Sequence, residues 1–566
     1  MLLTNPKKYF GWLIIPILYT LIFWRTFFSP LVLLDDSPTA SLNLLKSISA
    51  GGYSLPWTLM GILDSLLQLL HSSHLLFHLL IIIGMLVSSI YLRKLIPKHP
   101  ILPTLIYLFN PFSYSRIIVG QIGLLFSYLT LPLYTYYLIE FFRNGFSTKN
   151  LSKLALAFTL TGLFAIHFYV ISFIIFIAAS IFFLNKGDLK PYSLKSALLA
   201  VLIILLNIQL LMNLSHSSTL FQSIDASDQA FFSPKLTQDV PAIAKIIGMW
   251  GFWREGAYIT TYKTLPLWLW YSLTLMFPLL MLIGYYSKKD NKSKFFYSLW
   301  WIGLIFATGI SHPYTAPLFD FLFKHLPFFS GFRDSHKFVA LIALSYAYLC
   351  PIGIIWIRDK IRFSLNSPTL SRISKYLIPS IFIALILLYT YPLIGLWGQI
   401  KPAEYPQSYQ ETASFIDSQN ITGHIIYLPW EGYLTYNWTV GTSPDGRIAV
   451  PINNLVKQII IVYPGQWGGT NELQQNLTLC LNNQSISCLE NRGVQYILND
   501  RCASFPTHYS WINLSSVHSD SCIDIYQLNN KIRVDRTIHP PLRFIIGSLI
   551  SLITLIGIII YLVRKR

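Results

Sequence analysis

The sequence predicts a polytopic α-helical membrane protein that carries one small α/β domain outside the membrane. Of the 566 residues, 53% are hydrophobic and only 12% are charged, and the mean hydropathy is +0.51. Apolar runs of the roughly 20 residues that a bilayer-crossing helix needs recur between residues 10 and 397 and again at 544–563. Soluble, fibrous and disordered proteins have other compositions, so these classes are excluded.

We predict about twelve membrane-spanning helices. The first follows a basic start that resembles a signal peptide, but no small-residue cleavage site comes after it, so it is expected to stay as a helix. One apolar stretch is too long for a single span, and we divide it at His167. The predicted spans are 10–28, 75–92, 101–115, 122–142, 154–167, 170–185, 196–214, 265–286, 295–310, 338–357, 377–397 and 544–563.

The basic residues of the membrane part lie mostly on one side of these spans. With the amino terminus inside, the short cytoplasmic segments hold 23 Lys and Arg, whereas the opposite loops hold 9. Inserted helices show this positive-inside bias. We therefore expect a plasma-membrane protein with both termini in the cytoplasm and with residues 398–540 outside the cell membrane.

Residues 398–540 depart from the membrane pattern and separate a membrane domain at 1–397 from a closing helix and basic tail at 541–566. They hold 8 Lys and Arg against 11 Asp and Glu, so the net charge of +18 belongs to the membrane part. Nucleic acid is therefore not an expected partner. Short apolar runs predict a small α/β domain. The expected strands are 424–429, 457–464, 493–500 and 522–528, and the expected helix is 408–420.

Four of the five cysteines lie in this domain, and an even number in an exported domain indicates disulfides. Three pairings are open. We favour Cys480 with Cys488 and Cys502 with Cys522, because these pairs close short loops. A four-cysteine zinc site is the rival interpretation, but the CxxC spacing that zinc sites usually show is missing.

Two adjacent carboxylates, Asp35 and Asp36, come directly after the first predicted span. Neighbouring carboxylates repel each other, so keeping both indicates a bound cation, a general base or a hydrogen-bond network. The plainer interpretation is a solvated helix end, with Ser37 and Pro38 starting the next turn. An amphipathic stretch follows, which suits a site where lipid meets water.

Basic side chains on the external side run against the topology bias and are therefore candidates for a function. The segment FLFKHLPFFSGFRDSHKF contains Arg333, His336 and Lys337, and Arg116 is the only charge in the apolar segment NPFSYSRIIVGQIG. Arg binds phosphate through its planar fork, and Lys binds it as a point charge. Side chains reaching for lipid headgroups are the alternative.

The long external loop at 215–263 carries carboxylates and aromatic rings that suit an acceptor groove for sugars. Its candidates are Asp225, Asp228, Trp253 and Glu255. For most of its aromatic residues we favour the plainer interpretation, a membrane-interface belt.

Other motifs point to no further chemistry. His71, His74 and His78 share one helical face and resemble a metal ligand set, but this is the less favoured interpretation. No HExxH, GxSxG, GxxxxGK[ST] or WWDYG-type block occurs. A metalloprotease, a hydrolase, a nucleotide-driven pump and an oligosaccharyltransferase are therefore not indicated.

Together these motifs resemble the GT-C superfamily of membrane glycosyltransferases. The Asp35-Asp36 pair resembles the modified DxD signature of their first external loop, and NPFSYSRIIVGQIGLLFSYLTLPL resembles their asparagine-proline, arginine, glycine-glutamine hairpin. SGFRDSHKF is similar to a segment of the actinobacterial α-(1→3)-arabinofuranosyltransferase group. The many-helix layout with a late external α/β domain also fits.

The resemblance implies transfer of a sugar from a polyprenyl-phosphate donor to an extracytoplasmic glycan, lipid or protein acceptor. It implies Asp35 or Asp36 as the base, and Arg116, Arg333, His336 and Lys337 as contacts of the donor phosphate. A divalent ion, Mg²⁺ or Mn²⁺, on the two aspartates is left open, because members of the superfamily differ in this respect.

Two other classes of function are kept as alternatives. One is a lipid-linked glycan flippase or a non-catalytic scaffold, and the other is a protein that only binds glycans through residues 398–540. A flippase needs polar residues along a path inside its helices. The interiors of the predicted spans are almost entirely Leu, Ile and Phe, which favours the transferase.

Overall fold

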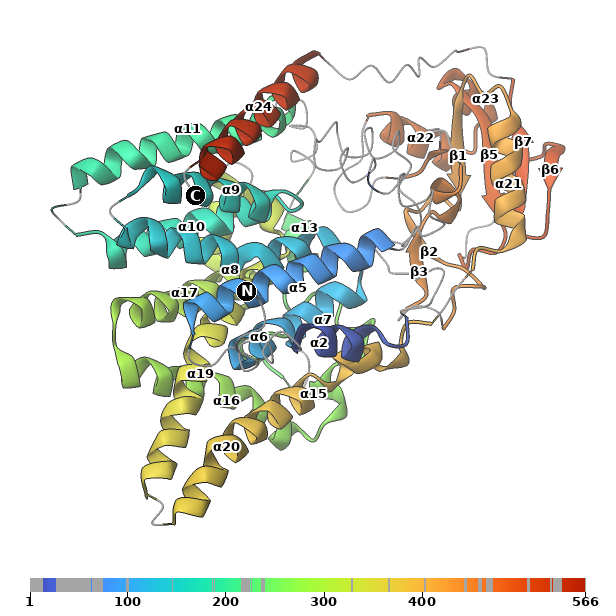
Figure 1. Cartoon of the computed structure of the whole chain (residues 1–566). Helices are drawn as coiled ribbons and strands as arrows, with labels where there is room; N and C mark the ends of the chain where they lie inside the picture. The colour runs from blue at the N-terminus through green and yellow to red at the C-terminus, as the bar shows by residue number, and fades with distance from the viewer. Residues whose placement is uncertain are drawn as a thin grey trace.

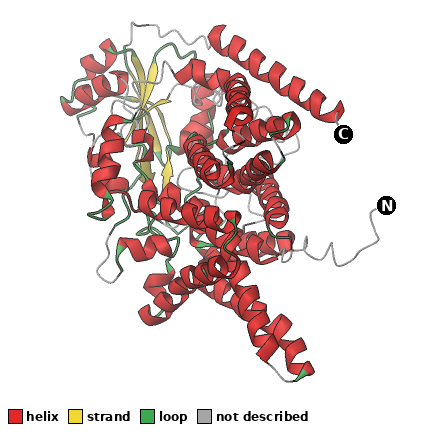
Figure 2. Cartoon of the chain, turned by 90° about the vertical axis from the view of Figure 1, so that its left-hand side faces the viewer, coloured by secondary structure: helices red, strands yellow, loops and turns green. Residues whose placement is uncertain are grey.

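A computed structural model shows a bundle of helices and, beside it, a domain built on a β-sheet (Figure 1). The two parts are also distinct in the turned view, where the strands lie to one side of the bundle (Figure 2). The structure describes residues 14–26, 63, 75–97, 101–144, 146–185, 187, 189–214, 224, 226–235, 240–326, 329–364, 367–401, 404–441, 445–456, 461–464, 472–505, 509, 511–529, 532 and 542–564.

Long apolar helices dominate the bundle. Seven helices among the described residues are long and apolar enough to cross a membrane, and an eighth span results if Asn291–Ser311 and Ala316–His325, bent by 84°, count as one. The polytopic helical class is thus confirmed, whereas a total of twelve spans is not. The long helices are α5 (Leu75–Leu95), α8 (Ile122–Arg143), α11 (Leu189–Leu214), α16 (Leu267–Lys288), α17 (Asn291–Thr308), α19 (Val339–Ser364), α20 (Pro368–Tyr389) and α24 (Leu542–Arg564).

The predicted span 101–115 is wrong as a single helix. It consists of α6 (Ile101–Leu108) and α7 (Pro111–Ile118), each of eight residues. Asn110 separates them, because its side chain accepts a hydrogen bond from the Ser113 amide at 2.9 Å and so caps α7. Pro111 follows at the first turn of α7, where its missing amide hydrogen costs nothing.

Other predicted spans differ in their bounds. The spans 154–167 and 170–185 correspond to α9 (Thr148–Gly162) and α10 (His167–Phe183), so the chain does break beside His167. The span 377–397 corresponds to α20, which ends at Tyr389 because Pro392 cannot continue a helix. A shorter helix, α2 (Ile14–Phe23), lies within the first predicted span.

The most enclosed long helix is α19, which packs against α16, α17, α20 and α6. Two glycines allow α16 and α19 to touch through their backbones. A Cβ atom on Gly284 would lie 2.1 Å from the carbonyl oxygen of Leu349, and one on Gly353 would lie 2.2 Å from that of Leu280. Any larger side chain at either glycine would push the helices apart. Around this core, α24 lies along α11 at the edge of the bundle (Figure 1).

The sheet domain has a mixed five-stranded sheet with the order β4-β1-β5-β7-β6, in which β1 is parallel to β4 and β5, and β7 is antiparallel to β5 and β6. A separate antiparallel hairpin joins β2 to β3. The elements are α21 (Gln407–Ser418), β1 (His424–Leu428), β2 (Tyr433–Thr435), β3 (Arg447–Ala449), β4 (Ile461–Val462), α22 (Glu472–Asn482), α23 (Ile486–Asn491), β5 (Val494–Asp500), β6 (Ser516–Ser519) and β7 (Ile523–Gln527).

Both faces of this sheet are covered, since side chains alternate along each strand. Ile425 and Tyr427 of β1 pack with α21 and the β2–β3 hairpin, while Ile426 and Leu428 pack with α22 and α23. The predicted strands 424–429, 493–500 and 522–528 correspond to β1, β5 and β7. Of the predicted strand 457–464, residues 461–464 are described, and β4 is confined to Ile461–Val462.

Two disulfides lie in the sheet domain. Cys480 is joined to Cys488 within the α22–α23 unit, and Cys502 is joined to Cys522 between the ends of β5 and β7. These are the pairs that the loop lengths favoured. The remaining cysteine, Cys350, is buried in α19.

Candidate functional site

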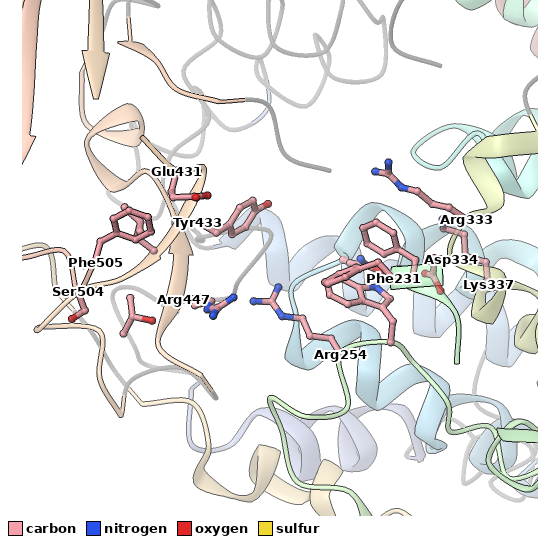
Figure 3. A pocket seen from close by; sticks show the side chains of 15 residues that line it. Phe231, Arg254, Arg333, Asp334, Lys337, Glu431, Tyr433, Arg447, Ser504 and Phe505 are labelled. Carbon is pink, nitrogen blue, oxygen red and sulfur yellow. The ribbon is translucent and has the colours of Figure 1, made fainter. Parts of the chain in front are cut away.

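A cavity of about 600 Å³ lies between the helix bundle and the sheet domain. One wall comes from the loops at the end of the bundle, and the other comes from the β2–β3 hairpin and residues 504–505. Figure 3 shows the side chains of the two walls facing each other across the space. The loops that the charge bias places on one side of the membrane therefore meet at one site.

The helical wall is built on a buried ion pair. Arg116, in the last turn of α7, is completely buried, and its Nη1 atom donates to Asp334 Oδ2 at 2.9 Å and to Gln121 Oε1 at 2.5 Å. Its guanidinium also lies 4.2 Å from the ring centre of Phe252. The pair joins segments 218 residues apart in the chain, so it fixes α7 against the start of α19.

His336 completes this network. It is completely buried, and its Nδ1 atom lies 3.0 Å from Arg116 Nη2. Since Arg can only donate, Nδ1 must accept, and the imidazole is neutral at that nitrogen. Burial by itself would raise the pKa of Asp334, but Arg116 and Lys337 more than offset it, so the pKa is lowered and the carboxylate is ionised at neutral pH.

Arg333 and Lys337 bring positive charge to the cavity. Lys337 lines it with only 8% of the residue exposed, and its Nζ atom donates to the Gly331 carbonyl at 3.2 Å. Arg333 lies 3.8 Å from Asp228 and over the ring of Phe232 at 4.6 Å. Both cations are largely shielded from bulk water, where their attraction for an anion is strongest.

Aromatic rings surround these cations. Phe231 and Phe232 of α13 (Ala226–Phe232) pack against Trp253, with ring centres 5.3 Å and 4.8 Å from that of the tryptophan, and all three line the cavity. Trp253, a predicted acceptor contact, therefore lines the cavity. It belongs to an aromatic cluster there and is not an isolated tryptophan at the membrane interface.

The opposite wall belongs to the sheet domain. Glu431, Tyr433, Arg447 and Phe505 line it. Burial raises the pKa of Glu431, and Arg447 offsets part of that rise. One ion pair connects the two walls, since Arg254 Nη2 lies 3.1 Å from Asp445 Oδ2.

Apart from Glu255, the site residues predicted from the sequence fall into three groups. Arg333, Lys337 and Trp253 line the cavity, and Asp228 is paired with the first of these. Arg116 and His336, predicted as direct phosphate contacts, lie behind the wall and support it. Asp35, Asp36 and Asp225 lie outside the described residues.

Glu255 lies away from the cavity wall. It is buried, and its Oε2 atom pairs with Lys245 Nζ at 3.3 Å and accepts from the Tyr262 hydroxyl at 2.8 Å. Its Oε1 atom accepts from the backbone amide of Gly251. The side chain is fully used in holding its own loop, which makes it a structural residue rather than the predicted acceptor contact.

Sequence reasoning missed the whole sheet-domain wall. The residues of that wall come from a short hairpin and a loop without any motif, so only the alternation in GYLTYN could have drawn attention to them. Gln121 was also missed, although it lies in the glycine-glutamine segment that supports the resemblance.

No metal cluster is found within the part of the chain that the structure describes, where no three His, Cys, Asp or Glu side chains gather to hold an ion. Of the three histidines on the predicted helical face, His71 and His74 lie outside the described residues. His78 Nδ1 forms a hydrogen bond with the Tyr19 hydroxyl at 2.6 Å. Asp35 and Asp36 remain the metal candidates.

Solved structures with the same fold exist. The chain is similar to the single-particle cryo-EM structure of arabinofuranosyltransferase AftD from Mycobacteria, with a TM-score of 0.62, 12% identity, and 93% of this chain but 40% of that one covered. A mutant of that enzyme gives a TM-score of 0.58 at 11% identity, with 93% and 42% covered. No family model and no curated protein sequence matches.

These likenesses define the fold. The chain has the GT-C fold that its motifs led us to expect, and it spans about 40% of the length of the mycobacterial enzyme. At 11–12% identity the likeness shows the fold alone, and the residues of the cavity determine what chemistry is possible.

Proposed function

We propose that this protein is a membrane glycosyltransferase that moves a sugar from a polyprenyl-phosphate donor to a glycan, lipid or protein acceptor. The observation that carries the proposal is the cavity between the helix bundle and the sheet domain, with Arg333 and Lys337 in its helical wall, in a chain with the fold of a membrane arabinofuranosyltransferase. We place the reaction at the extracytoplasmic face of the plasma membrane, with both termini in the cytoplasm.

In this proposal the cations serve the leaving group. An acceptor hydroxyl gives its proton to Asp35 or Asp36 and attacks the anomeric carbon of the donor sugar, and the bond from that carbon to the phosphate oxygen breaks. The departing polyprenyl phosphate gains negative charge, which Lys337 and Arg333 offset. Arg116, Asp334 and His336 act as positioning residues, because they form the buried network beside those cations. Asp334 also lines the cavity, whereas Arg116 and His336 lie behind its wall.

Truncating either cation should impair use of the donor. We expect Lys337→Ala and Arg333→Ala to raise the KM for the polyprenyl-phosphate sugar or lower kcat/KM at least about 30-fold, because losing one partner of a desolvated charge pair costs about 2–5 kcal/mol. The measurement is transfer of labelled sugar from synthetic polyprenyl-phosphate donors by the purified full-length protein in nanodiscs.

A matched control is available on the neighbouring helix. Lys324 in α18 (Ala316–His325) is exposed, pairs with Asp320 at 2.7 Å and does not line the cavity. Lys324→Ala should leave donor kinetics unchanged. If all three variants use the donor equally well, the basic cluster serves lipid headgroups and the phosphate site lies elsewhere.

A further inference from the structure

The β2–β3 hairpin presents a polar face to the cavity. In its antiparallel register Thr435 pairs with Arg447, and Leu434 pairs with Ile448. Paired residues point to the same face and neighbours alternate. Leu434 and Ile448 are buried in the core of the domain, so Tyr433, beside Thr435 on the other face, and the exposed Arg447 are turned to the cavity that they line.

This face is held rigidly. The Ser504 amide donates to the Thr435 carbonyl at 2.7 Å, and the Asn437 amide donates to the Cys502 carbonyl at 2.9 Å, so the segment leading to Phe505 lies along β2. The disulfide from Cys502 to Cys522 ties the same segment to β7. A wall fixed on both sides is suited to binding, because little ordering is needed when a ligand arrives.

The charges of the cavity divide between the walls. Arg254 and Arg333 each have an acidic partner, Asp445 at 3.1 Å and Asp228 at 3.8 Å. Among the described residues, Lys337 and Arg447 line the cavity without an ion pair as close as these, although the charge of Lys337 lowers the pKa of Asp334 and that of Arg447 offsets part of the rise in the pKa of Glu431. One of these two cations lies on the helical wall and the other on the sheet wall, as Figure 3 shows.

Two separate cations suit two separate anions. The proposed function uses Lys337, on the wall that the helix bundle provides, for the phosphate of the donor. Arg447 stands across the cavity on a wall that belongs entirely to the water-exposed domain. A second anionic group, presented by a ligand that comes from water, fits there, and the rings of Tyr433 and Phe505 offer flat apolar surfaces beside it.

We propose that the β2–β3 wall is the acceptor subsite and that it binds a saccharide carrying a carboxylate or phosphate. Arg447 binds the anion, Tyr433 and Phe505 pack against sugar rings, and Glu431 accepts from sugar hydroxyls. The cavity volume of about 600 Å³ is of the size that encloses ligands of a few rings. That the bound saccharide is the acceptor rests on the proposed function, but the binding itself does not depend on transfer.

Binding to defined oligosaccharides tests the inference. Full-length protein in nanodiscs is titrated with three probes: an oligogalacturonide, its carboxyl-reduced neutral form, and a mannose oligosaccharide bearing one phosphate. We expect at least one acidic probe to bind about 10-fold or more tightly than the neutral probe, since hydrogen bonds to charged groups are stronger than neutral ones. Which acidic probe binds identifies the source of the anion.

Variants locate the binding on this wall. Arg447→Met should remove the preference for the acidic probe, Arg447→Lys should keep part of it, and Phe505→Ala should weaken binding of acidic and neutral probes alike. The matched control is Arg492→Met, since Arg492 is exposed in the same domain but does not line the cavity. Equal melting temperatures show that the variants are folded.

Three results would overturn the inference: no measurable binding of any probe, equal binding of acidic and neutral probes, or an acidic preference that Arg447→Met leaves intact. The proposed function fails differently. If the parent protein transfers no sugar from any polyprenyl-phosphate donor but binds the acidic probe through Arg447, the transferase proposal is lost and the saccharide subsite stands.

Discussion

Asp334→Asn is expected to lower the free energy of unfolding by about 3–5 kcal/mol, because it leaves the Arg116 guanidinium buried without its counter-charge. Asparagine keeps the shape and one acceptor oxygen, so the loss reports the charge and not a cavity. Arg116 is completely buried and Asp334 is 4% exposed, which leaves water little room to replace the missing carboxylate.

The measurement is the melting temperature of the purified protein in detergent, followed by intrinsic fluorescence. Asp320→Asn is the matched control, because Asp320 lies on the nearby helix α18 and pairs with Lys324 at 2.7 Å, with its side chain 39% exposed. A surface pair of this kind contributes about 0–1 kcal/mol. Asp334→Asn should therefore have a clearly lower melting temperature than the parent protein, and Asp320→Asn should have nearly the same one.

A double variant separates charge from packing. Arg116→Met with Asp334→Leu removes both charges, and apolar replacements of buried pairs often keep or increase stability. We expect this variant to melt above Asp334→Asn but to use the donor poorly, because Lys337 and Arg333 lose the network that positions them. If Asp334→Asn and Asp320→Asn have the same melting temperature, other groups balance the charge of Arg116. The network of Arg116, Asp334 and His336 then does not stabilise the cavity wall.

The helices of the bundle were largely predictable because hydropathy is a local property. The bounds of α8, α16 and α17 lie within a few residues of the predicted spans. Hydropathy does not show, however, where a helix is interrupted within an apolar run. The apolar run 101–115 was assigned to one span, although the Asn110-Pro111 pair already contained the capping residue and the proline that divide it.

The candidate site was only partly predictable, for two physical reasons. Basic residues on the predicted external side drew attention to both Arg116 and the segment around Asp334. The sequence alone does not show that these two residues, 218 positions apart, form an ion pair. The structure places Arg116, predicted as a phosphate contact, behind the cavity wall in an ion pair with Asp334. Arg447 gave no signal at all, because one exposed arginine in a hairpin is ordinary until the fold places it against the bundle.

The described structure brings the end of α2 to the entrance of the sheet domain. A Cβ atom on Gly395 would lie 2.6 Å from Trp24 Nε1, and one on Gly398 would lie 2.3 Å from Arg25 Nη1. Residues 391–398 lead directly into the domain whose hairpin forms one wall of the cavity. The last described residues before the proposed base thus lie beside the segment that leads into the sheet domain. Asp35 follows Arg25 by ten residues in the chain.

We expect Asp35→Asn or Asp36→Asn to lose most of the transfer activity, because an amide cannot take the proton of the acceptor hydroxyl. Loss of general-base help lowers rates about 10²–10⁴-fold. Asp35 is our preference, since it lies closer to the end of the first helix. The measurement is kcat for transfer from a polyprenyl-phosphate sugar, together with donor affinity, which the substitution should leave unchanged.

Chelation tests the second role that these carboxylates can have. If a divalent ion joins them, EDTA should abolish transfer by the parent protein, and added Mg²⁺ or Mn²⁺ should restore it, whereas a pure general base is indifferent to EDTA. Asp320→Asn again serves as the control for replacing a carboxylate on the same protein. Parent-like transfer by both single variants and by the double variant would move the base to Asp225, Asp228 or Asp334, of which Asp228 is the next to test, because it already lies 3.8 Å from Arg333 at the cavity.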